Sequence, residues 1–261
     1  MNKDISIVVP VYREVETIGM VLERLLDIEC VSQIVVVDDR SDDGSWDAIQ
    51  KYAAVDKRIQ SVQHTRNSGK SRALRTGFAL TTGSIVLVQD ADLEYDPNEI
   101  PDLVRPIVEG VADVVYGSRF LVRHASRVLY FYHYLGNRLI TFISNLFTNI
   151  NFTDVETGYK AFRGDIIRNM IIESKGFGFE IEASAKIAKL KCRVYEVPIS
   201  YYGRTYEEGK KIGYKDGLYA LFYIFKYNVF RSLKTSFTQT PYVHRETRFQ
   251  SVGFPTKKMK N

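Results

Sequence analysis

Residues 84–94 read Ser-Ile-Val-Leu-Val-Gln-Asp-Ala-Asp-Leu-Glu, an apolar run that stops at acidic residues. The run over 84–89 is typical of a buried strand, because aliphatic residues follow one another without a charge. Carboxylates at the end of such a strand are costly to bury unless a cation lies near them. Hard divalent cations prefer carboxylate oxygens, and Asp92 and Glu94 can point the same way in an extended segment. Helix-capping acids before Pro97 are the alternative, and the stretch alone favours neither interpretation.

Strand and helix patterns alternate on both sides of this run. Strands are predicted over 5–9, 33–37, 59–63, 112–116 and 193–199, and helices over 16–28, 45–54, 70–80, 98–109 and 178–190. This alternation predicts an α/β fold, with a mostly parallel twisted sheet flanked by helices on both faces. Ligands bind at the carboxyl ends of such strands. Four aspartates follow strand ends: Asp38, Asp39, Asp90 and Asp92.

The second half of the chain is richer in aromatic residues than the first. Of 17 Tyr, 15 Phe and one Trp, five lie in residues 1–115 and the others follow. Helical periodicity over 128–147 and over 214–230 gives both predicted helices an aromatic face. Such amphipathic helices can lie in a membrane interface, or their aromatic faces can fill an ordinary core. The pattern fits both interpretations equally.

Length, charge and composition limit the class of protein. The 261 residues are 45% hydrophobic and 26% charged, which is ordinary for a soluble globular protein. We expect one domain over 1–230 and a basic, flexible tail over 231–261, which holds seven Lys/Arg and one Glu of a chain with formal charge +5. Two cysteines are too few for a disulfide framework, and we find neither a secretory signal nor a long uncharged apolar stretch. These features indicate a cytoplasmic protein.

Two weaker motifs each have a structural alternative. Residues 38–45 can bind a base or ribose through their first acids, or simply form a turn and a helix cap. Gly69-Lys70-Ser71 is not a phosphate-binding P-loop, because His64 stands where that motif needs a glycine. Its glycine turn can still bind an anion through backbone amides. The sequence has no dinucleotide fingerprint, no Ser/His/Asp motif and no zinc-like spacing of its four histidines.

The order of the segments is more specific than any one of them. The chain contains, in order, Val8-Val9-Pro10-Val11-Tyr12-Arg13-Glu14, Val37-Asp38-Asp39-x-Ser41-x-Asp43-Gly44-Ser45, Arg66-Asn67-x-Gly69-Lys70, Gln89-Asp90-Ala91-Asp92 and Tyr116-Gly117-Ser118-Arg119. This order resembles a family 2 inverting glycosyltransferase of the GT-A fold. Residues 157–162 and 196–199, Thr-Gly-Tyr-Lys-Ala-Phe and Glu-Val-Pro-Ile, look like the dolichyl-phosphate mannose synthase branch, which includes bacterial polyprenyl-phosphate glycosyltransferases. The resemblance covers about residues 4–230, but Arg13 stands where relatives have Asn.

The resemblance implies a role for each matching residue. Nucleotide-sugar binding would fall to Pro10, Tyr12, Glu14, Asp38, Asp39, Lys70 and Asp90. Asp92 and Glu94 would bind Mg²⁺ or Mn²⁺, although relatives often have Gln where this chain has Glu94. Arg119 would contact phosphate near the reacting centre, and with Asp90 and Asp92 it forms the implied catalytic set. Arg204 and Lys210 match a basic pair that binds acceptor or donor phosphate.

These roles imply an inverting, metal-dependent transferase. It would move a sugar from a nucleotide donor, of the GDP-mannose or UDP-glucose type, to a dolichyl or undecaprenyl phosphate. A lipid phosphate is already an ionised nucleophile, whereas a hydroxyl acceptor needs a base. The candidate bases are Asp154, Glu156, Glu180 and Glu182. Extension of a saccharide at a hydroxyl is therefore one alternative, and a non-catalytic nucleotide-sugar-binding or membrane-docking protein is another.

The same resemblance implies a role for each half of the chain and a set of partners. Residues 1–115 would be the nucleotide-sugar and metal half, and residues 116–230 the acceptor half with its amphipathic helices. The expected partners are the nucleotide sugar, the polyprenyl phosphate and the cytoplasmic face of a membrane, to which the protein would attach peripherally. No feature of the sequence indicates a nucleic-acid partner.

Overall fold

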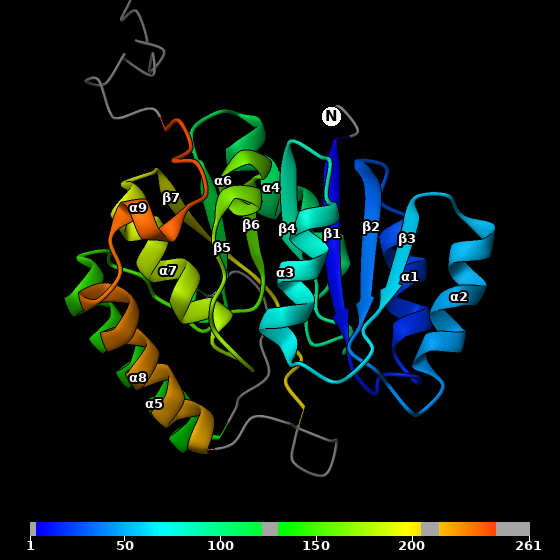
Figure 1. Cartoon of the computed structure of the whole chain (residues 1–261), viewed down its shortest axis with the longest axis horizontal. Coiled ribbons are helices and arrows are strands. Elements are labelled where there is room, and N and C mark those ends of the chain that lie inside the picture. The colour runs from blue at the N-terminus through cyan, green and yellow to red at the C-terminus, as the bar shows by residue number, and fades with distance from the viewer. Residues whose placement is uncertain (1–3, 122–129, 205–213, 244–261) are drawn as a thin grey trace, which may run out of the picture.

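The predicted mostly parallel α/β sheet is confirmed. The computed structural model describes residues 4–121, 130–204 and 214–243 (Figure 1). Within these ranges one sheet has the strand order β3-β2-β1-β4-β6-β5-β7. The strands are β1 (Ile5–Val11), β2 (Val31–Asp38), β3 (Ile59–Gln63), β4 (Ile85–Val88), β5 (Val114–Ser118), β6 (Lys160–Arg163) and β7 (Val194–Pro198). All neighbouring strands pair in parallel except β6, which runs antiparallel to both β4 and β5.

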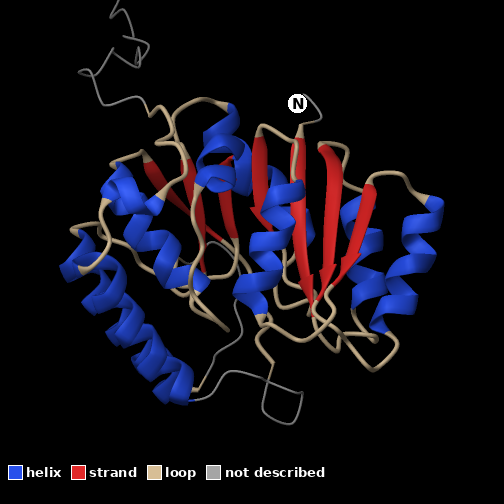
Figure 2. Ribbon diagram, in the orientation of Figure 1, coloured by secondary structure: helices blue, strands red, loops and turns tan. Residues whose placement is uncertain are grey.

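Helices cover both faces of the sheet (Figure 2). They are α1 (Ile18–Leu26), α2 (Ser45–Val55), α3 (Lys70–Leu80), the short η1 (Pro97–Glu99), α4 (Ile100–Val108), α5 (Phe131–Thr148), α6 (Gly164–Asn169), α7 (Phe179–Leu190), α8 (Tyr214–Val229) and α9 (Leu233–Ser236). One hydrophobic core joins the sheet to α1, α2 and α4, and a second joins it to α3, α6 and α7. β6 was missed by the sequence analysis, because a four-residue strand that starts at the buried Lys160 has no apolar run.

Helix α3 lies very close to β1. A Cβ atom at Gly77 would come within 2.3 Å of the Val8 side chain, so only glycine allows this approach. The approach brings the first turn of α3, and with it Lys70, to the carboxyl end of β1. The motif over 69–71 is thereby placed beside the acidic ends of the central strands.

Helices α5 and α8 pack side by side outside α7 (Figure 1). Their mutual contact includes the rings of Phe147 and Phe225, whose centroids are 6.3 Å apart. In α5 the buried residues are Thr141 and Ser144, so the polar side of this helix faces inward. The large apolar side chains of the two helices that face solvent are Phe131, Tyr132, Tyr134, Leu135, Leu139, Phe142, Leu146, Phe147, Leu218, Tyr219, Phe222, Phe225 and Val229. We call these residues the aromatic surface. Val128, also assigned to the apolar face, lies outside the described residues.

The predicted flexible tail needs a correction. Its first part, up to Val243, is folded onto the body: Phe237 is 3% exposed and bridges to Met170. Arg231 forms an ion pair with Glu173 at 2.6 Å. The basic composition of the segment did not indicate this packing, because a single buried aromatic side chain, Phe237, anchors it. Residues 244–261 lie outside the described part of the chain.

Within the described ranges, no helix is long and apolar enough to cross a bilayer.

Candidate active site

A cavity of about 430 Å³ lies at the carboxyl ends of β1 and β4. Eleven of the residues proposed from the sequence line it, namely Pro10, Tyr12, Glu14, Asp39, Lys70, Asp90, Asp92, Glu94, Arg119, Glu180 and Arg204. Glu156, one of the candidate bases, lines it as well. Lys210 lies outside the described residues. The strand ends therefore bring together segments that are more than a hundred residues apart in the sequence.

Asp38 and Asp39 end β2 and have different surroundings. Asp39 accepts hydrogen bonds from His64 Nδ1 at 2.7 Å and from the amides of Ser68 and Gly69, the latter at 2.6 Å. It therefore holds the glycine turn that leads into α3. Asp38 is fully buried behind it and is not among the cavity-lining residues. Of these two acids, only Asp39 has access to a ligand in the cavity.

Lys70 connects two acids across the cavity. Its ammonium lies 2.8 Å from Asp90 and 3.2 Å from Glu180. Burial acts to lower the pKa of Lys70, but the two carboxylates outweigh it and raise that pKa well above its ordinary value. A Cβ atom at Gly158 would lie 2.6 Å from Asp90 Oδ2, so the chain passes this site without a side chain. Lys70 is therefore a charged group at neutral pH and can face an anion.

Arg204 contacts acids in the loops that follow β1 and β4. Its guanidinium lies 3.0 Å from both Glu14 and Asp92 and 3.7 Å from Glu94. The oxygens of Glu94 also accept hydrogen bonds from the Arg204 amide at 2.9 Å and from the Tyr201 hydroxyl at 2.8 Å. Glu94 is thus engaged in anchoring the 201–204 segment. Asp92 remains the acid of this group with the clearest access to a cation.

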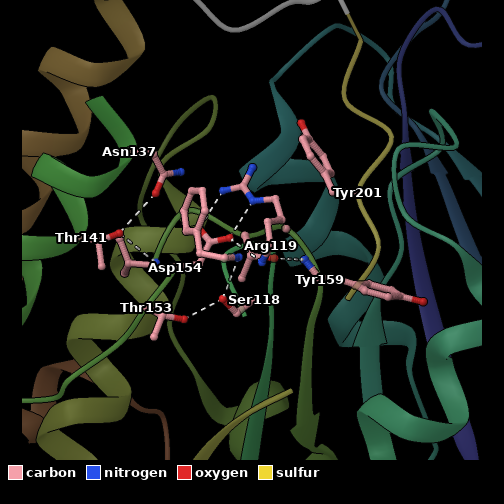
Figure 3. Close-up of polar contacts among 12 residues, drawn as sticks. Ser118, Arg119, Asn137, Thr141, Thr153, Asp154, Tyr159 and Tyr201 are labelled. Atoms are coloured by element: carbon pink, nitrogen blue, oxygen red, sulfur yellow. Dashed lines mark hydrogen bonds and ion pairs between the residues drawn. The ribbon is translucent and has the colours of Figure 1, made fainter. Parts of the chain in front are cut away.

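Arg119 is held by Asp154 at the end of β5 (Figure 3). The guanidinium makes a two-point ion pair with the carboxylate, at 2.6 and 2.7 Å, and lies over the ring of Tyr201. Burial acts to raise the pKa of Asp154, but Arg119 outweighs it and keeps that pKa below its ordinary value. Asp154 is fully buried and does not line the cavity. It therefore serves to position Arg119, and it is poorly placed to act as a base.

The inward polar side of α5 supports the loop that carries Asp154. The Thr141 hydroxyl accepts a hydrogen bond from the Val155 amide at 3.3 Å, and Figure 3 shows Thr141 and Asn137 pointing toward this loop. The Asn145 side chain binds both the amide and the carbonyl of Phe152, at 3.2 and 2.8 Å. Helix α5 thus holds the loop that carries Asp154, and Asp154 in turn holds Arg119.

The acid cluster fits a divalent cation that is shared with a substrate. Burial, followed by the nearby charges of Asp90 and Glu94, raises the pKa of Asp92 to about 7, so the cluster has more negative charge than Arg204 balances. Carboxylate oxygens suit Mg²⁺ or Mn²⁺, and Mg²⁺ typically takes one or two carboxylates plus substrate phosphates. Among the described residues no group of three or more metal-ligating side chains is placed to bind a metal by itself. The remaining ligands would have to come from a bound diphosphate and water.

The sequence analysis missed some residues of the cavity. Tyr95 and Tyr201 line it, and the Tyr95 hydroxyl accepts a hydrogen bond from the Gly158 amide at 3.0 Å. Gly176 lies against Gly69, where a Cβ would come within 3.1 Å of the Gly176 nitrogen. No local motif marks these positions. Glu182, another candidate base, is fully buried in an ion pair with Lys186 and is not among the cavity-lining residues.

Solved structures share the fold of this chain. Glucosyl-3-phosphoglycerate synthase of Mycobacterium tuberculosis, solved with Mn²⁺, UDP and phosphoglyceric acid, superposes with a TM-score of 0.68 over 87% of this chain and 79% of that one. The sequence identity is 17%, so the likeness concerns the fold. The fold is that of the GT-A glycosyltransferases.

The sequence relationship is narrower. Residues 6–171 match glycosyl transferase family 2, and the chain belongs to this family of enzymes. It is 34% identical to undecaprenyl-phosphate mannosyltransferase of Micrococcus luteus, over 79% of this chain and 86% of the relative. It is 28% identical to dolichol-phosphate mannosyltransferase of Pyrococcus furiosus, over 80% of this chain and 59% of that longer relative. The predicted glycosyltransferase, and its likeness to the polyprenyl-phosphate branch, are confirmed.

Proposed function

We propose that this enzyme transfers a hexose from a nucleotide sugar to a polyprenyl phosphate, with inversion at the anomeric carbon and with a divalent cation. The observation that carries the proposal is the cavity itself, which is lined both by Asp92 and by the cations Lys70, Arg119 and Arg204. The mannosyltransferase relatives supply the acceptor class and favour mannose as the sugar.

The charges of the cavity suit a diphosphate leaving group. Breaking the anomeric bond builds negative charge on the diphosphate, and preorganised cations in a dry site stabilise such charge strongly. When bound, a metal on Asp92 would supply further stabilisation of this leaving group. Arg119 is held in one direction by Asp154, so it can orient an incoming phosphate without first reorganising. Pro10, Tyr12, Glu14 and Asp39 lie at the β1 and β2 end, where we place the nucleoside.

The acceptor class rests on the relatives and on the state of the candidate bases. Asp154 and Glu182 are occupied by ion pairs, with Arg119 and Lys186 respectively, so neither is ready to remove a proton from a hydroxyl. Glu156 and Glu180 line the cavity, so they are the remaining candidates for that task. A phosphate monoester needs no base because it is already ionised, and the mannosyltransferase relatives favour a polyprenyl phosphate as the acceptor.

We further propose that the aromatic surface binds the cytoplasmic face of a membrane. An isoprenoid acceptor lies in a bilayer, and a surface helix with exposed Trp, Phe or Leu side chains inserts into the interface in proportion to its apolar area. The α5 and α8 side chains that face solvent include Phe142 at 59% and Phe222 at 57% exposed. The polar side of α5 supports the loop of Asp154, which holds Arg119, so this helix connects the surface to the proposed reaction centre.

The test is a donor panel with the purified full-length chain. GDP-mannose and UDP-glucose are each incubated with Mg²⁺ or Mn²⁺ and a short polyprenyl phosphate, and the glycolipid is measured. We expect one donor to be used and EDTA to stop the reaction. Asp92→Ala should lower the rate by at least about 10²-fold, whereas the exposed Asp47→Ala is the matched control. Transfer to a saccharide hydroxyl but not to the lipid, or wild-type rates in Asp92→Ala, would overturn the proposal.

A further inference from the structure

Two carboxyl groups in the cavity have oxygens without a hydrogen-bond donor. Glu180 Oε2 and Glu156 Oε1 are buried and accept no hydrogen bond from any described residue. Glu180 is 4% exposed and is the second residue of α7, while Glu156 belongs to the loop that follows Asp154. Both side chains line the cavity. We call Glu156 and Glu180 the carboxyl pair.

Apart from the ion pair of Glu180 with Lys70, the carboxyl pair has no evident structural task among the described residues. A buried acceptor without a donor costs about 1–3 kcal/mol, so such groups are rare unless a ligand satisfies them. Burial, and then the charge of Glu180, raises the pKa of Glu156 to about 7. At neutral pH the pair can therefore hold a proton as well as lone pairs, and it can both donate and accept.

The charge of the pair decides which ligand fits. A second metal ion is disfavoured, because the Lys70 ammonium already lies between Glu180 and Asp90, at 3.2 and 2.8 Å. A phosphate or a carboxylate would meet like charge. Neutral hydroxyl groups fit, since each can donate to one carboxylate oxygen and accept from a protonated one. Gly158, two residues after Glu156, lies directly against Asp90, since a Cβ atom there would come within 2.6 Å of Asp90 Oδ2, so the loop of Glu156 borders the cavity closely at this point.

We propose that Glu156 and Glu180 bind the hydroxyl groups of the transferred sugar and select a neutral hexose over an anionic one such as a uronic acid. This inference rests on the proposed function and names the part of the cavity that binds the sugar. We place the nucleotide and the diphosphate at the β1, β2 and β4 ends, so substitutions in the pair should act mainly on binding of the sugar.

The experiment compares nucleotide sugars with the nucleotides alone. Binding of GDP-mannose, GDP, UDP-glucose, UDP-glucuronate and UDP to the full-length protein is measured by calorimetry with Mg²⁺. In the wild type we expect the neutral nucleotide sugar of the preferred base to bind more tightly than its nucleoside diphosphate. Glu156→Gln and Glu180→Gln should each reduce this preference about tenfold, the effect of losing a hydrogen bond to a charged group. Affinity for the diphosphate alone should stay within about twofold.

Controls separate this inference from the function on which it rests. Glu29→Gln makes the same chemical change at an exposed site and should leave all affinities unchanged. Circular dichroism and thermal unfolding check the fold, and Glu156→Asp provides a second, still acidic variant. Unchanged preference in both glutamine variants, or equally tight binding of UDP-glucuronate and UDP-glucose by the wild type, overturns the inference alone. A wild type that binds no nucleotide sugar overturns the proposed function.

Discussion

At the scale of single residues, the main feature of the cavity is that Arg204 occupies the place of a cation. Its guanidinium contacts Glu14 and Asp92 at 3.0 Å each, and Asp92 is the acid we assign to the metal. A divalent ion on Asp92 would compete with this arginine for the same oxygens. We therefore propose that Arg204 balances part of the acidic charge before a metal and donor arrive, and that the exchange frees a cation for the phosphates.

This competition predicts the effect of Arg204→Gln on metal binding. Without nucleotide, the variant should bind Mn²⁺ more tightly than the wild type, by about 3- to 10-fold, because a competing positive charge is removed. Electron paramagnetic resonance of free Mn²⁺ measures this directly. Arg66→Gln, at an exposed arginine, is the matched control. Equal or weaker Mn²⁺ binding in Arg204→Gln would contradict the exchange.

Glu156 predicts a pH dependence of stability. Its charged form is disfavoured by burial, by Glu180 and by Asp154, and favoured by Lys160 and Arg119, with a net rise of its pKa to about 7. The folded chain therefore binds a proton more tightly than the unfolded one, where Glu titrates near pH 4.3. This contribution to stability is fully present at low pH and is lost as the pH rises from about 4 to above 7.

Glu156→Gln removes this titration. The unfolding free energy of the variant minus that of the wild type should be larger at pH 8 than at pH 5, by about 1–3 kcal/mol. The variant is thus relatively more stable at the higher pH. Urea unfolding at the two pH values measures the difference, and effects of the substitution that do not depend on pH cancel. A difference of the opposite sign would mean that Glu156 is stabilised as an anion.

At the scale of elements, α5 exposes its aromatic side to solvent and buries part of its polar side against the protein. The sequence pattern predicted an aromatic and a polar side but could not predict which side faces the protein, because both sides have partners of a suitable kind. The outcome depends on the loop 151–155, whose backbone takes its hydrogen bonds from Thr141 and Asn145. These partners come together only in the folded chain.

The exposed aromatic residues predict vesicle binding. Phe131→Glu together with Phe142→Glu should weaken binding to anionic vesicles at least tenfold, since two exposed aromatic side chains that would insert into the lipid are exchanged for charges that it repels. Co-sedimentation with vesicles measures the loss. Val55→Glu, at a residue that is 88% exposed on α2, serves as the control. Vesicle binding unaffected by the double substitution would remove the aromatic surface from the proposal.

The local patterns predicted some parts of the fold and site and not others. The acids at the ends of β2 and β4 follow apolar runs, so their position could be predicted from neighbouring residues alone. The contact of Arg204 with Asp92 spans 112 positions, and no periodicity indicates it. β6 escaped prediction because its charged Lys160 is buried, where its ammonium donates hydrogen bonds to the carbonyls of Val155 and Thr157 in the preceding loop.

At the scale of the whole molecule, the packed segment 231–243 predicts where the chain can be shortened. A chain that ends after Val243 should keep its unfolding free energy within about 0.5 kcal/mol. A chain that ends after Phe230 loses the buried Phe237 and should lose about 3 kcal/mol. Thermal and urea unfolding compare the two. Equal stability of both truncated chains would show that Phe237 contributes nothing to the fold.

The inward polar side of α5 has a consequence for how activity is assayed. Thr141 and Asn145 attach α5 to the loop of Asp154, and Asp154 sets the direction of Arg119. On the proposed membrane surface, a tilt of α5 would be passed on through these contacts to the guanidinium that we place near the acceptor phosphate. We therefore expect a rate measured in plain buffer with a water-soluble acceptor to differ from the rate with the same acceptor in the presence of vesicles.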